Sequence, residues 1–278
     1  MKKLCVLLAS VCFILSATAQ DETEKQDSKD QKNKSDTIRM GNVTIITSKG
    51  KRNHDSAHHH NRHGSKPKNV NTSWFTLDLG FNNYTDNTNY SSLDAQQFAP
   101  GATKDWFELR PVKSVNVNIW IITQRLNLIR HAVNLQYGLG LELNNYHYEE
   151  EIRFRENPTS VYLDQIRYRK NKLATDYITI PVMLNFNLTP KSYEHRSIGF
   201  SVGVSAGYLY SSRQKYISDE TGKEKLKDDF DLRPFKISYV GELKMGPIKL
   251  YGSLATESIF EKGLDQTPYT FGIRFSHD

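Results

Sequence analysis

The segment from Ala132 to Tyr148 alternates between apolar residues and polar or small ones, beginning at Val133 and running through Asn144. Successive side chains of a β-strand point to opposite faces, so a period of two predicts a strand with one apolar face. Strands of soluble sheets average about five or six residues, whereas a membrane-spanning strand needs about 9–11. The segment is therefore typical of a transmembrane β-barrel strand.

Seven further segments repeat this alternation. The eight expected strands are residues 73–82, 114–124, 132–148, 177–188, 197–210, 235–243, 248–255 and 268–276. Long polar connections alternate with short ones, as in a barrel with short periplasmic turns and long outer loops. An even strand number lets the sheet close on itself and removes its edges. Pro181 predicts a bulge or a local break in its strand, because proline has no N–H to donate.

The sequence therefore predicts an all-β fold. It is an eight-stranded antiparallel up-and-down transmembrane β-barrel over residues 73–278, located in the cell outer membrane. Only 37% of the residues are hydrophobic. No internal run approaches the roughly 18 apolar residues of a membrane helix, so any span must be β.

The first 19 residues have the features of a secretory signal peptide. Two lysines precede an apolar stretch from Leu4 to Leu15, and a small-x-small site ends at Ala19. An uncleaved anchor helix and a lipoprotein modified at Cys12 are less favoured alternatives. The two cysteines of the sequence fall in this segment, so the mature chain is expected to lack thiols and disulfides.

Residues 20–72 predict a disordered, polar, His-rich periplasmic tether, because a charged segment without apolar periodicity cannot bury enough surface to fold. The patch from Val43 to Ile46 is strand-like. It could pair with a partner's edge or the barrel rim, although a transient strand in a linker is favoured. A periplasmic protein partner could bind through this tether. Five histidines form a weak candidate site for Zn, Ni or Cu ions, although basic flanks favour a solvated linker: His54, His58, His59, His60 and His63.

Alternation alone does not decide whether the apolar face points to lipid or to an interior. A soluble lipocalin-like barrel is the alternative. Long strands, a second face rich in Gly, Ser and Asn, and tyrosines near the strand ends favour the membrane barrel. Six charged residues then face the lumen and are expected to form ion pairs that plug it: Asp78, Glu142, Glu242, Lys236, Lys249 and Arg274.

The chain resembles the PorT-like and OmpA/OmpX-like families of small Gram-negative outer-membrane β-barrels. The likeness lies in the Ala19-Gln20 junction and in three segments: Trp74–Gly80, Ile178–Val182 and Pro268–Phe275. This resemblance implies insertion by the outer-membrane assembly machinery and contact with outer-membrane lipid and lipopolysaccharide. It supplies no shared catalytic residues.

No phosphate loop, zinc-protease motif or Gly-x-Ser-x-Gly elbow is present, so no cofactor is predicted. A nucleic-acid partner is not expected for an exported chain. The favoured function is a non-enzymatic structural, adhesion or assembly/secretion-accessory role. The alternative is a barrel enzyme acting on lipid A or phospholipid acyl chains, with His147, a serine and an acid such as Glu149 near the outer rim.

The segment from Glu149 to Lys172 predicts a polar hairpin that carries four arginines: Arg153, Arg155, Arg167 and Arg169. If the arm around Arg153 and Arg155 pairs with the arm around Arg167 and Arg169, the four guanidinium groups share one surface. Such a surface suits phosphate or sulfate recognition. A charged, soluble hairpin without a ligand is the alternative interpretation.

Overall fold

The computed structural model describes residues 36–40, 43–47, 69–189 and 197–276. The chain divides into two compact units, Met1–Gly64 and Ser65–Asp278. In the first unit, β1 and β2 form an antiparallel hairpin in which Ile38 pairs with Ile45. The bounds of these two strands are Asp36–Met40 and Val43–Thr47. The patch expected to be strand-like thus lies in β2, and its partner is the segment just before it.

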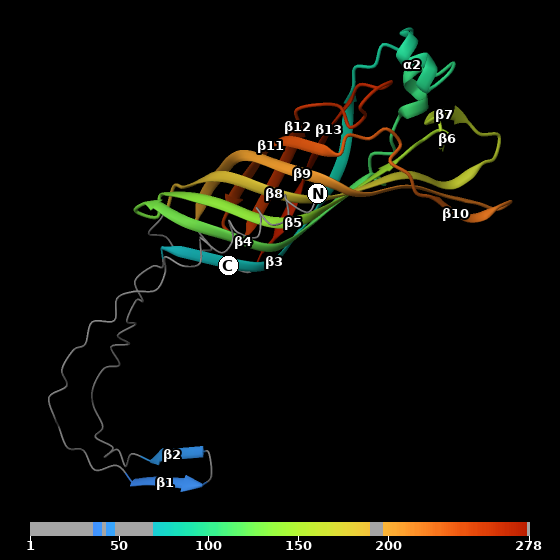
Figure 1. Ribbon diagram of the computed structural model, residues 1–278. Helices are drawn as coiled ribbons and strands as arrows, with labels where there is room; N and C mark the ends of the chain where they lie inside the picture. Colours follow the sequence, from blue (N-terminus) through green and yellow to red (C-terminus); the bar gives the residue numbers. More distant parts are fainter. Residues whose placement is uncertain (1–35, 41–42, 48–68, 190–196, 277–278) are drawn as a thin grey trace, which may run out of the picture. The chain divides into compact units, whose positions relative to one another are not determined.

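The second unit contains eleven strands, one α-helix and one 3-10 helix among its described residues (Figure 1). In chain order they are β3 Val70–Asp86, α2 Leu93–Phe98, η1 Lys104–Phe107, β4 Val115–Ile129, β5 Val133–His147, β6 Ile152–Arg155, β7 Ser160–Leu163, β8 Tyr168–Asn187, β9 Ile198–Ser218, β10 Gly222–Leu226, β11 Phe235–Met245, β12 Ile248–Ala255 and β13 Gln266–Phe275.

Eight of these strands form a closed antiparallel barrel in the order β3-β4-β5-β8-β9-β11-β12-β13. The barrel closes where β13 pairs with β3, with Phe271 opposite Phe81. Each strand pairs with its neighbour in the chain, which is the up-and-down topology. All eight expected strands are confirmed. Six are longer than expected. The largest extensions are in β3, which begins at Val70, in β4, which ends at Ile129, in β8, which begins at Tyr168, and in β9, which ends at Ser218.

Pro181 produces a local break, not a bulge. The pairing of β8 with β5 is interrupted at Ile180 and Pro181, whereas on the other side Pro181 pairs in register with Ser205 of β9. Towards β5, the paired residues pass from Tyr137↔Val182 to Gly140↔Thr179 without a change of register. The register of β8 against β9 instead shifts between Asp176 and Tyr177.

The apolar face of the barrel points outward, as the membrane interpretation requires. Val202 in β9 is 51% exposed, whereas its neighbour Ser201 is 2% exposed. The same pattern holds along β8, where Ile180 and Val182 are exposed and Thr179 is buried. A soluble barrel would have the opposite phase, so that alternative is wrong. Among the described residues, no helix is long and apolar enough to span a membrane.

The long connections between the strands meet at one end of the barrel and form a hydrophobic core of their own. Figure 1 shows α2, β6, β7 and β10 near that end. We call this assembly the outer lobe. It comprises the described residues 87–114, 148–177, 211–234 and 256–265. Its core is made of aromatic and aliphatic side chains: Phe98, Phe107, Tyr148, Ile152, Phe154, Val161, Leu173, Phe230, Leu232, Ile259, Phe260 and Leu264.

Candidate functional site

A buried charge network crosses the lumen of the barrel near Arg274. Its guanidinium group donates to both carboxylate oxygens of Asp78, at 2.7 and 2.8 Å, and pairs with Glu242. Asp78 also accepts from the indole nitrogen of Trp120 at 2.7 Å. The side chains of Arg274 and Asp78 are 8% and 0% exposed. Such a pair is stable in an interior only when hydrogen bonds satisfy the remaining charge, as these do.

A second ion pair joins Lys236 to Glu142 across the lumen. Glu142 also accepts from the side-chain amide of Asn144 at 3.0 Å. Lys249, the sixth charged residue expected in the lumen, donates to the hydroxyl of Ser276. The space left beside the network is a cavity of about 30 Å³, lined by Asp78, Glu142 and Arg274 among others. A cavity of this size holds about one water molecule, so the described side chains fill the lumen at this level.

Aromatic rings from separate connections pack together in the core of the outer lobe. The ring centroid of Phe154 in β6 lies 5.2 Å from that of Phe230 and 6.3 Å from that of Phe260. Phe98 of α2 contacts Phe260 at 5.5 Å. Gly263 adopts a φ of +84°, and a Cβ atom there would lie 2.5 Å from Phe98, so this close approach requires glycine. The core therefore ties four outer connections to one another, those that follow β3, β5, β9 and β12.

Gln214 fixes the β6–β7 hairpin to the barrel wall. Its side-chain oxygen accepts from the backbone N–H of Phe154 at 3.0 Å. Its side-chain nitrogen donates to the carbonyl of Ile152 at 2.9 Å and to Asn171 at 3.0 Å. Gln214 is fully buried, so all three bonds form away from water. A buried amide satisfied in this way holds the hairpin in one position.

The four candidate arginines do not share one surface in the way expected. The arm Ile152–Arg155 pairs with Ser160–Leu163, not with the segment around Arg167 and Arg169. A further strand, β7, lies between the two arms. It is only four residues long, so its alternation is too short to be recognised in the sequence. The expected pairing of the two arginine-bearing arms is therefore wrong.

Each arginine has its own surroundings. Arg153 pairs with Asp164 at 3.3 Å and with Glu224 at 3.2 Å. Arg155 is exposed and its guanidinium carbon lies 4.1 Å from the ring centre of Tyr162. Arg169 pairs with Asp219 at 3.2 Å, with both side chains largely exposed, and Arg167 is exposed. Arg153 thus has two acidic partners within the lobe, and the other three arginines are on its surface.

Asp164 organises the same corner of the lobe. Its carboxylate accepts from the hydroxyl of Tyr168 at 2.6 Å and from Arg153. Partial burial raises the pKa of Asp164, but hydrogen bonds from Tyr168, from the backbone of Ile166 and from Arg153 outweigh it and lower the pKa overall. Asp164 is therefore an ionised link between β6 and the start of β8.

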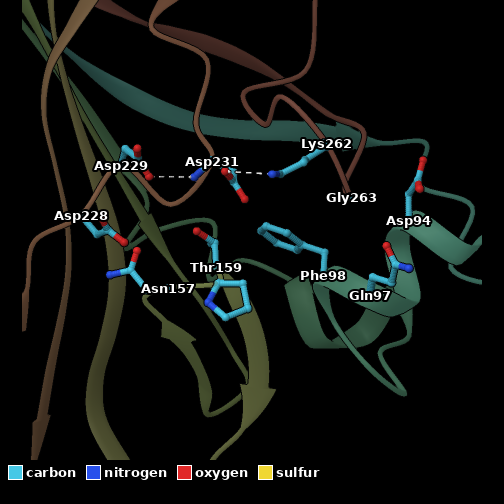
Figure 2. A pocket seen from close by; sticks show the side chains of 11 residues that line it. Asp94, Gln97, Phe98, Asn157, Thr159, Asp228, Asp229, Asp231, Lys262 and Gly263 are labelled. Atoms are coloured by element: carbon cyan, nitrogen blue, oxygen red, sulfur yellow. Dashed lines mark hydrogen bonds and ion pairs between the residues drawn. The ribbon is translucent and has the colours of Figure 1, made fainter.

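An acidic hollow of about 550 Å³ opens on the outer lobe. Figure 2 shows Phe98 of α2, Asn157 from the β6–β7 connection, and Asp228 and Asp231 from the segment before β11 around this opening. Lys262 contacts Asp231 at 3.4 Å. This hollow could not be predicted from the sequence, because its residues come from connections that have no periodic pattern.

The residues around His147 do not form a serine hydrolase arrangement. The backbone N–H of His147 donates to the hydroxyl of Ser114 at 2.9 Å. Among the described contacts, the imidazole makes no hydrogen bond or ion pair. Burial lowers the pKa of His147, and Lys172, Lys170, Lys113 and Arg110 lower it further. Basic side chains thus surround the imidazole of His147. In a catalytic triad, an acidic side chain would instead be paired with it.

Metal binding by the histidine tract falls outside the described residues, as do the predicted signal peptide and most of the predicted tether. Within the described part of the chain, no group of three or more His, Cys, Asp or Glu side chains is placed to hold a metal ion.

Comparisons with known proteins bear on the barrel. A family model described as "Outer membrane protein beta-barrel domain" matches residues 68–264. Comparison with curated proteins gives no match. A solved structure that resembles the chain is that of Ail, the attachment invasion locus protein of Yersinia pestis, in complex with the heparin analogue sucrose octasulfate. The two are 11% identical, with a TM-score of 0.32, over 73% of this chain and 98% of that one. A likeness of this size carries no argument about function.

Proposed function

Because this chain belongs to the outer membrane protein beta-barrel domain family, we propose that it is a non-enzymatic outer-membrane protein whose barrel displays the outer lobe as a recognition surface for adhesion. The observation that carries this proposal is the separate hydrophobic core of the lobe, built from segments that are distant in the sequence. A packed core gives a connection one conformation, and a surface of fixed shape can recognise a partner at low entropic cost.

The filled lumen supports a display role rather than transport. Asp78, Arg274 and Glu242 occupy the barrel interior with their charges paired, and the cavity beside them is about 30 Å³. Moving a solute through this region would require breaking buried ion pairs, which is costly. The barrel wall therefore serves to hold the lobe at the cell surface.

Three of the four predicted arginines suit recognition of an anionic glycan. Arg155, Arg167 and Arg169 are exposed on the lobe. Exposed guanidinium groups bind sulfate and phosphate through two parallel hydrogen bonds. Arg153 instead serves the lobe as a structural residue in this proposal, because Asp164 and Glu224 already neutralise it.

The finer features predicted from the sequence belong to this proposal. They are the signal peptide, the PorT-like and OmpA/OmpX-like affinity, insertion by the outer-membrane assembly machinery, contact with lipopolysaccharide, and a periplasmic partner for the tether. The histidine tract remains a weak candidate metal site. An assembly or secretion-accessory role is the alternative non-enzymatic function.

The test uses the full chain refolded in detergent micelles and dextran sulfate as the anionic glycan. The triple variant Arg155→Ser, Arg167→Ser, Arg169→Ser should bind several-fold more weakly, and added salt should weaken binding of the parent protein because exposed charges are screened. Equal binding by parent and triple variant would refute the arginine surface. Release of acyl chains from lipid A or phospholipid, abolished by His147→Ala, would refute the non-enzymatic role.

A further inference from the structure

The outward face of β8 and β9 changes its chemistry where the strands leave the aliphatic band. In β9 the exposed residues Val202, Val204, Tyr208 and Tyr210 alternate with buried or small ones. The register shift opposite Asp176 and Tyr177 then places an extra residue in β9, since Asp176 pairs with Ser211 and Tyr177 with Leu209. Beyond this bulge, the odd-numbered residues of β9 point outward.

Three lysines stand directly opposite one another on this face. Lys215 of β9 pairs with Lys172 of β8 on one side and with Lys225 of β10 on the other. In the next outward row, Ile217 stands between Lys170 and Lys223. We call these five residues the lysine face: Lys170, Lys172, Lys215, Lys223 and Lys225.

The charges of the lysine face are not compensated by acids. Within the described part of the chain, no carboxylate lies within ion-pair distance of any of the five lysines. Asp176, the acid on the same face, is paired with Arg213. Glu224 lies between Lys223 and Lys225 in sequence, but it points to the opposite face and contacts Arg153. Alternation along β10 thus puts its lysines outward and its glutamate inward.

The proximity of these charges is unfavourable for the isolated protein. Like charges directly opposite on neighbouring strands destabilise a sheet. Burial lowers the pKa of Lys215, and Lys223, Lys170, Lys225 and Arg213 lower it further. A fold that retains opposed lysines without acids has a surface complementary to an external polyanion.

We propose that the lysine face binds the phosphate groups of glycolipids in the outer leaflet that surrounds the barrel. Lysine is a point charge that suits phosphate. The face continues the lipid-facing surface past Tyr208 and Tyr210, which are 46% and 45% exposed, as expected for an aromatic girdle. Lys215 lies five residues beyond Tyr210, about 17 Å along the strand before tilt is considered. Phosphates in the headgroups of lipids at the girdle are therefore the external anions that we expect this face to meet.

The experiment measures binding of bis-phosphorylated lipid A to the full chain in detergent micelles. The test variant is Lys215→Gln, Lys225→Gln, and the matched control is Lys104→Gln, Lys262→Gln, which removes the same charge from exposed positions elsewhere on the lobe. The test variant should bind on the order of thirtyfold more weakly, because it loses two of the charges that attract an anionic surface. The control variant should bind like the parent protein.

Three further measurements test whether the lysines bind phosphate. Lipid A stripped of its phosphates should bind the parent protein weakly, and equal binding would show that acyl chains dominate and would overturn the proposal. Equal binding of lipid A by test variant and parent would overturn it too. The test variant should unfold at the same temperature as the parent or higher, because repulsion is relieved. A variant that loses lipid A binding only because it unfolds at lower temperature would also count against the proposal.

This site and the arginine surface can fail independently. The lysine variant should keep its binding of dextran sulfate, and the triple arginine variant should keep its binding of lipid A. If the lysine variant loses dextran sulfate and retains lipid A, the face binds a soluble polyanion and the membrane assignment is wrong.

Discussion

The barrel and the outer lobe are built partly from the same strands but have opposite distributions of polar and apolar residues. In the lower part of β9, Val202 faces outward and Ser201 faces inward. In the upper parts of β8 and β9, Lys172 and Lys215 face outward, while Leu173 and Tyr216 are buried. The inversion occurs near the β9 bulge opposite Asp176 and Tyr177.

The difference shows that the medium outside each part of the molecule, lipid or water, determines which side chains stabilise its interior. Lipid offers no hydrophobic driving force for burying apolar side chains, so the barrel interior is held by hydrogen bonds and ion pairs such as Arg274 with Asp78. Water around the lobe does drive apolar burial, and there Phe154, Phe230 and Phe260 pack together. One chain thus uses two kinds of core.

The largest expected effect comes from breaking the lumen network. Arg274→Met removes the partner of Asp78 and Glu242 and leaves two buried carboxylates without a countercharge. The free energy of unfolding in micelles should fall by about 3–5 kcal/mol. Arg169→Met, which breaks an exposed pair with Asp219, is the control and should change it by about 1 kcal/mol at most. A loss no greater than that of the control would show that the network does not hold the barrel.

We expect that the core of the outer lobe can be destabilised while the barrel stays folded. Phe154→Ala removes a fully buried ring from the lobe, so the lobe should lose about 3–5 kcal/mol of local stability. Limited proteolysis should cut the outer connections faster, while the unboiled protein should still run as a compact band on a detergent gel. Leu163→Ala is the matched control in the same hairpin, because Leu163 is 40% exposed. Loss of the compact band in Phe154→Ala would mean that the two cores fold as one.

A charge on the outward face of the barrel should have a smaller effect that depends on depth. Val202→Arg should cost about 2–4 kcal/mol near the membrane midplane. Val202→Leu should be tolerated, because a larger apolar side chain has room against lipid. Refolding titrations in urea measure both variants. If Val202→Leu instead costs about 1–3 kcal/mol, Val202 packs in a crowded interior, and the assigned phase is wrong.

The barrel could be predicted from the sequence because its signal is local. Alternation along β5 and β9 marks the strands and separates their two faces. The length of the strands, the Gly-, Ser- and Asn-rich second face and the tyrosines near the strand ends assign the apolar face to lipid, so the six charged residues fall on the inner face. The ion pairs among these six residues could not be predicted from the sequence. They depend on the pairing of β13 with β3, which closes the barrel, and on the register of the other strands. Arg274 contacts Asp78, a residue nearly two hundred positions earlier.

The outer lobe could not be predicted in the same way. Its core residues, such as Phe98, Phe107 and Phe230, occur singly in connections that are otherwise polar, so no period marks them. The lysine face was missed for a related reason. Its residues alternate in β8, β9 and β10, but only the pairing of the three strands brings Lys172, Lys215 and Lys225 into one row.

We expect the outward face of β9 to meet lipid at Val202 and water at Lys215. The two cysteines of the sequence are Cys5 and Cys12, within the predicted signal peptide, so Val202→Cys, Ser201→Cys and Lys215→Cys should each give a single site for a nitroxide label in the mature protein. In bilayers, the label at 202 should be most accessible to oxygen, the label at 215 to a water-soluble quencher, and the label at 201 to neither. A label at 202 that is shielded from oxygen, together with a label at 201 open to the water-soluble quencher, would contradict the account.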